Sequence, residues 1–316
     1  MRIVNFYFTG EKKMKKILAF ILSITMILGT AAALASCDGL EDFVKDDPAD
    51  SNYAAIDATD LLKEDFGIAI RKGDTALMNM VNEVVDAWVA DGTMTKYIDY
   101  YDALANGEAP AANGLKTSWD FGNASETITV YTESGFAPFE FVYNNEIIGV
   151  DIAIMNEVAE KNGMKVEVKD VDFNTITTCV KNATGYAVGA AGLTINDERK
   201  QEVDFSSIYF SSTLVIVSAK DKAISSVKDL SGLSVGVQEG TSGDLIISDA
   251  KNGGYTFTDY DENDNEIEVT VTVDANTTIK QYKHYAQALA DLKAGRIDAI
   301  LMDKLPAQIM LANAGN

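Results

Sequence analysis

The sequence predicts an α/β protein of two lobes, in which each lobe is a mainly parallel sheet flanked by helices. From residue 127 onward, short strand-like runs alternate with segments of helical periodicity, which is typical of parallel sheets covered by helices. The roughly 280 residues that follow residue 36 are enough for two domains of ordinary size. The chain has two cysteines, so we expect its apolar core, not a disulfide framework, to stabilise the fold.

Before residue 127 the sequence predicts a strand, two helices and a loop. An apolar run predicts a strand at 66–71, and Asp74 then provides the N-cap of a helix. Asp91-Gly92 ends this helix, a shorter helix follows from Thr93 toward Tyr101, and residues 103–122 have the Ala, Asn, Gly and Ser content of a linker. One face of the first helix is apolar at helical spacing, and it consists of Leu77, Val81, Val84, Val85 and Trp88.

The rest of the chain predicts strands and helices in alternation. The predicted strands lie at 127–131, 165–171, 187–191, 214–218, 234–238 and 299–302, and the predicted helices at 151–162, 174–181, 196–201, 242–251, 281–294 and 304–312. In such sheets ligands bind beyond the carboxyl ends of the strands, where the loops converge.

A polar hairpin is predicted between Gly253 and Thr277, with an acidic turn at residues 259–266. The spacing of its acids is similar to that of a calcium loop. However, Asp264 stands where such a loop needs glycine, and Thr270 stands where it needs a bidentate Glu. We interpret the segment as a solvated turn, with a calcium loop as the alternative.

The N-terminal segment predicts export. Met14-Lys15-Lys16 is followed by an apolar stretch at 17–34 and by Leu34-Ala35-Ser36-Cys37, which is the layout of a signal peptide. The final four residues resemble the cleavage site of a bacterial lipoprotein, which implies lipidation of Cys37. The alternative is a retained transmembrane helix, because about 18 apolar residues can just span a bilayer. We expect residues 1–13 to precede the true start.

After the signal segment 1–36, residues 37–52 form a polar, acidic run without periodicity that predicts a flexible tether. Residues 1–36 contain five basic residues and one acidic residue, so the remainder holds 21 basic against 47 acidic residues, a net charge of about −26. Nucleic-acid binding requires clustered Lys and Arg, so this charge argues against it. It suits a protein that stays dispersed outside a cell.

Six segments in order resemble the family-3 solute-binding proteins, which are the polar amino-acid receptors of ABC importers. The resemblance covers nearly all of residues 53–101 and 123–316, and it implies a two-lobed fold of the type II periplasmic-binding-protein class. The segments are Glu133-Ser-Gly-Phe-Ala-Pro-Phe-Glu-Phe141, Gly149-Val-Asp151, Asp172-Phe173, Ala191 to Arg199 with Val203-Asp-Phe-Ser206, Gly236 to Thr241, and Asp298 to Asp303.

The order of the segments departs from the family. Residues 65–93 resemble the family's C-terminal end but come first here. This predicts a circular permutation joined through the loop at 103–122, which is tolerated where the original termini lie close together at a surface. The alternative is a fragment of a tandem duplication. The permutation predicts lobe 1 at 66–208, lobe 2 at 53–61 and 214–316, and a hinge at 62–65 and 209–213, so that the tether enters lobe 2.

An amino-acid receptor must satisfy a carboxylate and an ammonium together. The guanidinium of Arg199 offers a planar fork that matches a carboxylate, although a surface ion pair with Glu198 or Glu202 is the alternative. Gly240-Thr241-Ser242-Gly243 lies between a predicted strand and helix, where free N–H groups suit an anion.

The resemblance implies that Asp303 binds the ammonium with the carbonyl of Gly192 and the hydroxyl of Thr194. The alternative for Asp303 is an N-cap of the following helix. Phe136 and Phe173 are expected as apolar walls, although a core role for Phe173 stays open. Specificity is expected to rest on Glu133, Gln238 and Met302. An acid at Glu133 would favour Lys, Arg or Gln-like ligands if it does not point to solvent, and the ligand itself is left open.

Other classes of function have little support in the sequence. We interpret His284, the only histidine, as an ordinary polar residue on a surface helix, and we expect no metal, no cofactor and no catalysis. One alternative is a dehydratase, because some dehydratases share the fold and Glu133 could serve as the acid. Another alternative is a receptor that signals through a membrane partner. We expect a monomer that closes its hinge on a free amino acid and is then bound by the membrane subunits of an importer.

Overall fold

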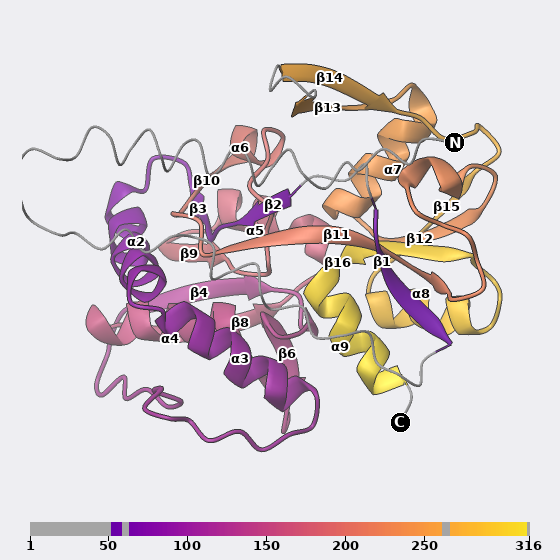
Figure 1. The fold of residues 1–316 in the computed structure, drawn as a ribbon. Helices are drawn as coiled ribbons and strands as arrows, with labels where there is room; N and C mark the ends of the chain where they lie inside the picture. Colours follow the sequence, from indigo (N-terminus) through magenta and orange to yellow (C-terminus); the bar gives the residue numbers. More distant parts are fainter. Residues whose placement is uncertain (1–51, 59–62, 261–265, 315–316) are drawn as a thin grey trace, which may run out of the picture.

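The computed structural model describes residues 52–58, 63–260 and 266–314, and these form two main sheets with their helices (Figure 1). The predicted signal segment 1–36, the lipidation site Cys37 and nearly all of the tether lie outside the described residues, as does the turn of the acidic hairpin at 261–265. Among the described residues, no helix has the length and apolar character required to cross a membrane.

Lobe 1 is the part of the chain built on the five-stranded sheet, in the order β10-β3-β9-β4-β8. β4 runs parallel to β8 and β9, whereas β3 runs antiparallel to β9 and β10. Its strands are β3 (Ala69–Arg71), β4 (Thr127–Thr132), β8 (Lys165–Asp170), β9 (Tyr186–Gly189) and β10 (Val203–Phe205).

Three helices of lobe 1 pack together along one side of this sheet (Figure 1). They are α2 (Thr75–Ala90), α3 (Thr93–Ala105) and α4 (Val150–Lys161), and the short helices η3 (Phe173–Thr175), α5 (Ile176–Asn182) and α6 (Arg199–Glu202) complete the lobe. α2 begins as predicted, since the Asp74 side chain accepts a hydrogen bond from the N–H of Leu77. All five residues of its predicted apolar face are buried, which confirms that helix.

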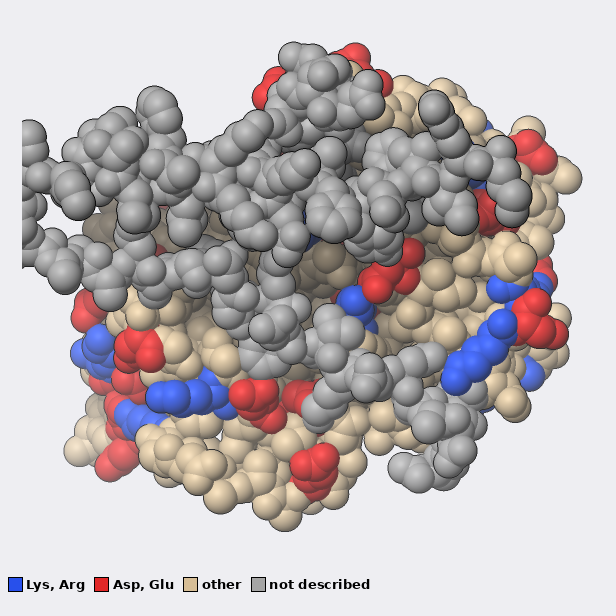
Figure 2. All heavy atoms as spheres, viewed as in Figure 1, with Lys and Arg blue, Asp and Glu red and all other residues tan. Residues whose placement is uncertain are grey.

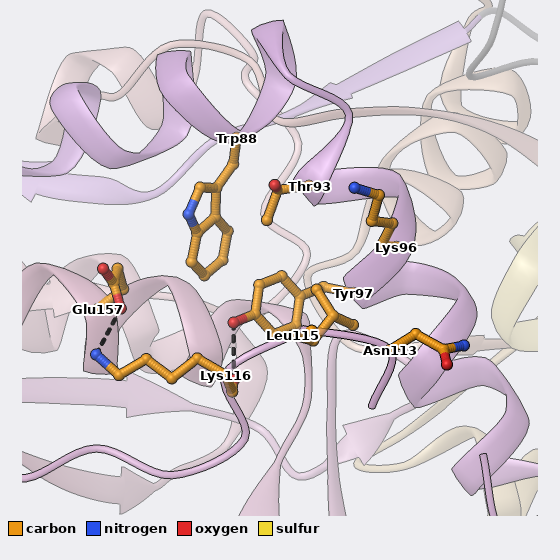
Figure 3. Close-up of a pocket in the computed structure, with 9 residues that line it drawn as sticks. Trp88, Thr93, Lys96, Tyr97, Asn113, Leu115, Lys116 and Glu157 are labelled. Atoms are coloured by element: carbon orange, nitrogen blue, oxygen red, sulfur yellow. Dashed lines mark hydrogen bonds and ion pairs between the residues drawn. The ribbon is translucent and has the colours of Figure 1, made fainter. Parts of the chain in front are cut away.

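The loop that joins α3 to β4 has no helix or strand, in agreement with the predicted linker, and side chains hold it against the helices. Trp88 stacks on Tyr97 with ring centroids 4.4 Å apart, and the Tyr97 hydroxyl donates to the carbonyl of Lys116 at 2.8 Å. Lys116 also forms an ion pair with Glu157 of α4 at 3.2 Å. A hollow of about 220 Å³ lies between these residues (Figure 3), and none of the predicted ligand-binding residues line it.

Lobe 2 is built on the six-stranded sheet, in the order β1-β11-β16-β12-β15, with β2 paired to the first half of β11. β16 is central, and all five of its residues are buried. The strands are β1 (Tyr53–Asp57), β2 (Lys63–Phe66), β11 (Phe210–Ala219), β12 (Ser234–Gln238), β15 (Thr278–Tyr282) and β16 (Ala299–Asp303). β12 runs parallel to its two neighbours, whereas β11 runs antiparallel to β1, β2 and β16, so this sheet is more mixed than predicted.

Helices cover both faces of this sheet. Leu301 of β16 belongs to an apolar cluster with α7 (Ser242–Asn252), and Ile300 belongs to another with α8 (Tyr285–Lys293) and α9 (Lys304–Ala314). Successive residues of a strand point to opposite faces, so the two clusters lie on opposite sides. The short helix η4 (Val227–Leu230) and the hairpin of β13 (Tyr255–Tyr260) and β14 (Glu266–Val271) complete the lobe, and the hairpin agrees with the prediction.

The helix predicted at 281–294 begins later than expected. Gln281 and Tyr282 end β15, which pairs with β12, and α8 starts only at Tyr285. His284 is therefore the N-cap residue of α8 and does not lie on a helix face.

Several short strands were not predicted, because strands of two to five residues carry little periodic signal. They are β10, β15 and the small sheet of β5 (Gly135–Phe136), β6 (Glu140–Tyr143) and β7 (Glu146–Ile148).

The chain passes between the lobes twice, and the two passages lie side by side. β2 pairs antiparallel with the first half of β11, with Phe66 opposite Phe210 and Lys63 opposite Thr213. β2 is followed directly by β3 of lobe 1, and β11 continues into the sheet of lobe 2. A hinge role for residues 62–65 and 209–213 stays a prediction. On the part of the face that is not covered by grey atoms, Figure 2 shows acidic and basic side chains interspersed.

Candidate ligand-binding site

The predicted site residues follow the ends of strands in both lobes. Glu133 comes directly after β4, Gln238 ends β12, and Asp303 ends β16, while Gly192 and Thr194 lie in the loop after β9. β4 and β9 are parallel, as are β12 and β16. The carboxyl ends of these strands therefore present their loops to the space between the lobes, as expected for ligand sites in such sheets.

The Arg199 side chain is buried and reaches across to lobe 2. Its Nη1 donates to the carbonyl of Thr194 at 2.8 Å, and its Nη2 donates to the carbonyl of Gly240 at 3.0 Å. The guanidinium also lies 5.3 Å from the centre of the Phe173 ring, which is the geometry of a cation–π contact. Arg199 is 8% exposed, so it does not form the surface ion pair that was the alternative.

A second acid, Glu64 of β2, joins Asp303 beside Arg199, and the sequence analysis missed it. Glu64 is 7% exposed and Asp303 is 6% exposed. Glu64 Oε2 and Asp303 Oδ1 are buried oxygens without a hydrogen-bond partner. Buried carboxyl groups of this kind are costly unless a donor satisfies them. The two oxygens are therefore open to a polar partner beside a cation.

Burial sets the charge of these acids. The pKa of Glu64 is raised to about 8, mainly by burial and also by the nearby Asp303 carboxylate, while Ser242 and Arg199 oppose the rise. Burial also raises the pKa of Asp303 to about 6, against the lowering effects of Ser212 and Arg199. Near neutral pH, Asp303 is thus mainly charged and Glu64 mainly uncharged. Burial lowers the pKa of Arg199, although Glu64 and Asp303 favour its charged form.

The start of α7 approaches lobe 1 through Ser242. The Thr241 hydroxyl caps the helix, since it accepts from the N–H of Asp244, and the Ser242 hydroxyl donates to that of Thr194 at 3.1 Å. The N–H of Gly240 donates to the Asp244 carboxylate at 2.9 Å and that of Thr241 to the carbonyl of Gln238. Two of the N–H groups expected to hold an anion are therefore bonded within lobe 2, while Ser242 faces lobe 1.

Glu133 is buried and bonded to lobe 2 by both carboxylate oxygens. Gln238 Nε2 donates to Oε2 at 2.9 Å, and His284 Nδ1 lies 2.5 Å from Oε1. Glu133 is 1% exposed, so it does not point to solvent. The interpretation of His284 as an ordinary surface residue was wrong, because the N-cap position of α8 directs its ring to Glu133.

Phe136 and Gly192 pack against each other on the lobe 1 side. Gly192 has φ +53°, and a Cβ at this position would lie 2.6 Å from Cε1 of Phe136, so the close approach requires glycine. The N–H of Gly192 donates to Oδ2 of the buried Asp151 at 2.9 Å, which fixes the orientation of this peptide. Phe173 is only half-buried and lies under Arg199.

Met302 is separated from the acids by the geometry of its strand. It is 1% exposed and belongs to the main apolar cluster, on the face of β16 opposite to Asp303. Its predicted contact with the ligand therefore stays a prediction. Of the residues that the structure describes, no three Asp, Glu, His or Cys side chains are grouped so that they could hold a metal ion.

The chain thus has the architecture of a two-lobed α/β binding protein, in which polar side chains of both lobes converge at the ends of the strands. The sequence model of the bacterial extracellular solute-binding proteins, family 3, matches residues 128–301, and the chain belongs to this family. The helices α2 and α3 lie outside the matched stretch, although both pack on α4 within it.

Several known proteins are similar to parts of the chain. The arginine-binding extracellular protein ArtP of Bacillus subtilis is 41% identical over 110 residues, which are 35% of this chain and 43% of ArtP. A probable histidine-binding protein of Neisseria gonorrhoeae is 34% identical over 128 residues, 40% of this chain and 47% of that protein. The chain thus spans about half the length of these curated relatives.

Among solved structures, an ancestral arginine-binding protein bound to arginine is 31% identical, with a TM-score of 0.51 over 61% of this chain and 77% of the other.

Proposed function

We propose that the chain binds one free amino acid between its lobes and holds it by closure of the two lobes. The observation that carries this proposal is that the buried Arg199 guanidinium lies near Asp303 and Glu64, each of which has a buried carboxyl oxygen without a hydrogen-bond partner. A zwitterion is the small solute that satisfies a cation and an anion together, and burial strengthens both interactions.

Each lobe contributes to both ends of the proposed ligand. Arg199 would bind the carboxylate with its free donors, aided by the hydroxyl groups of Thr194 and Ser242, whereas the Thr241 hydroxyl donates to the carbonyl of Gln238. Asp303 would bind the ammonium with the carbonyl of Gly192. Phe136 and Phe173 would enclose the stem of the side chain, and Glu133 and Gln238 would contact its end, whereas Met302 lies in the apolar core.

Contacts between the lobes support closure. Arg199, Ser242, Gln238 and His284 each make a hydrogen bond that crosses from one lobe to the other. A ligand that contacts both lobes would shift the population toward this arrangement. The paired strands β2 and the first half of β11 are the proposed hinge, because they are the only described segments through which the backbone passes between the two sheets.

Membrane attachment and delivery to an importer belong to the same proposal. The relatives include proteins described as ABC transporter arginine-binding proteins, and the Leu34-Ala35-Ser36-Cys37 segment fits lipidation of Cys37. The protein would then act as a monomer outside the cell and present its closed form to the membrane subunits. The proposed circular permutation has lobe 1 at 66–208 and lobe 2 at 53–61 and 214–316. Its support is that β1 pairs with β11 in the sheet of lobe 2 and β3 pairs with β9 and β10 in the sheet of lobe 1.

We propose that the protein is not an enzyme. Glu133, the acid considered for a dehydratase, is bonded through one oxygen to Gln238 and through the other to His284. A role in sensing remains the alternative, and it would use the same site and the same closure.

Thermal unfolding with each of the common amino acids tests the function. A ligand that binds only the folded state, at ~100 times its dissociation constant, adds about 2.7 kcal/mol of stability. We expect one amino acid, or a small group with a basic or amide side chain, to raise the unfolding temperature. The protein should first be unfolded and refolded to remove ligand carried through purification. A panel in which no amino acid raises the unfolding temperature would contradict the proposed function.

A further inference from the structure

Two consecutive residues of lobe 2, Lys283 and His284, contact two acids of lobe 1. Lys283 Nζ lies 2.5 Å from the carboxylate of Asp172, and His284 Nδ1 lies 2.5 Å from that of Glu133. Lys283 and His284 directly follow β15, whereas Glu133 directly follows β4 and Asp172 lies two residues after β8. Because β4 and β8 are neighbouring parallel strands, both acids lie at the same edge of the lobe 1 sheet.

The side chain of Gln238 holds both sides of the inner contact in place. Its Nε2 donates to Oε2 of Glu133 at 2.9 Å and to the carbonyl of Lys283 at 2.7 Å. Glu133 is 1% exposed and Gln238 is 2% exposed. The side chains of Lys283 and His284 are 61% and 45% exposed. The contact between the lobes therefore has a buried inner part at Glu133 and an outer part that solvent reaches at Asp172.

This contact is separate from the one that Arg199 makes. Arg199 donates to the carbonyl of Gly240, two residues before the start of α7. Lys283 and His284 instead precede α8, and α7 and α8 pack on opposite faces of the lobe 2 sheet. The two lobes are thus joined at two places, and Arg199 belongs to only one of them.

We infer that Lys283 and His284, bonded to Asp172 and Glu133, form a clasp that holds the lobes closed and raises the affinity for every bound amino acid alike. This inference rests on the proposed function. A contact made only in the closed form increases the population of that form, so it lowers the dissociation constant of each ligand by the same factor. Lys283 and His284 are positioning residues, because they act through closure and not through contact with the ligand.

Replacement of His284 by alanine tests the inner part of the clasp. Oε1 of the buried Glu133 would lose its donor in the closed form, so we expect the affinity for each bound amino acid to fall about tenfold. The loss should appear in the dissociation rate, because the lobes must open before the ligand leaves. His284→Asn carries a donor nitrogen near the position of Nδ1 and should restore most of the affinity. The His284 side chain makes no capping bond to α8, so neither variant removes one.

An exchange of charges tests the outer part of the clasp. Lys283→Glu would place two acids together, and the affinity should fall by about fivefold, since an exposed ion pair contributes little. The double variant Lys283→Glu with Asp172→Lys should regain most of this loss. The matched control is Lys161→Ala, which removes an exposed ion pair with Glu83 within lobe 1, at 2.9 Å. This control should leave the affinity unchanged.

Dissociation constants are measured by calorimetry for each common amino acid that the unsubstituted protein binds, and dissociation rates by displacement of the radiolabelled amino acid. The unfolding temperature without ligand shows whether each variant folds, and the charge exchange is an independent test if His284→Ala does not. Unchanged affinity in the folded clasp variants would overturn the inference. So would a loss that differs between amino acids or appears in the association rate. Binding of no amino acid by the unsubstituted protein would instead contradict the proposed function itself.

Discussion

Replacement of Arg199 by alanine should weaken amino-acid binding by about 100-fold or more, because loss of a buried charge partner costs 2–5 kcal/mol. The guanidinium has five donors, of which Nη1 and Nη2 each give one to a backbone carbonyl in the present structure. The remaining donors are available to a carboxylate. Alanine would leave that carboxylate buried without a cation.

Two controls show whether the loss of affinity comes from the binding role of Arg199. Arg199→Lys retains the charge but not the planar fork, so its affinity should lie between those of the alanine variant and the unsubstituted protein. The unfolding temperature without ligand shows whether the alanine variant folds. An alanine variant that folds normally and binds the amino acid with unchanged affinity would remove Arg199 from the site.

Replacement of Asp303 by asparagine should have a similarly large effect, again about 100-fold in affinity, since it removes the charge that faces the ligand ammonium. Asparagine preserves the volume at the end of β16, where all five residues are buried. The matched control is Glu64→Gln in the same cluster. The pKa of Glu64 is about 8, so this side chain is mainly uncharged at pH 7 and glutamine reproduces that state. We expect Glu64→Gln to weaken binding much less than Asp303→Asn.

The pH dependence provides a second readout for Asp303. Burial raises its pKa to about 6, and only the ionised carboxylate attracts an ammonium group. The affinity for the amino acid should therefore be highest above this pKa and should fall as the pH decreases through about 6. Asp303→Asn should lose this dependence. If Asp303→Asn and Glu64→Gln lost equal amounts of affinity, the two acids would act together. That result would contradict the separate role proposed for Asp303.

Local periodicity explains which parts of the fold the sequence predicts well. The α2 helix has both a capping Asp74 and an apolar face at helical spacing, and the structure buries that face in full. β12 occupies the predicted residues 234–238, because an apolar run between turn signals marks it on both sides. β15 was missed, since its T-I-K-Q-Y sequence is short, and pairing with β12 determines its state. That error also misplaced His284.

The candidate site depends on contacts between residues far apart in the chain. Arg199, Asp303 and Glu133 were found through their resemblance to family motifs, and the structure buries the first two near each other. Glu64 had a local signal that was not used. It lies two residues before the buried Phe66 on a strand, so both side chains point to the same face. The bond between Glu133 and His284 has no local signal at all, because it joins the two lobes across 151 residues.

The central claim is that one site recognises the carboxylate and the ammonium of the same amino acid. Calorimetric titration of the refolded protein tests it most directly, with the amino acid that gives the largest thermal shift, its methyl ester and its N-acetyl derivative. The ester lacks the charge that Arg199 would bind, and the acetylated form lacks the charge that Asp303 would bind. We predict one bound amino acid per chain and affinities for both derivatives that are lower by about 100-fold or more, since each leaves a buried charge unpaired. Binding of either derivative as tightly as the free amino acid would contradict the claim.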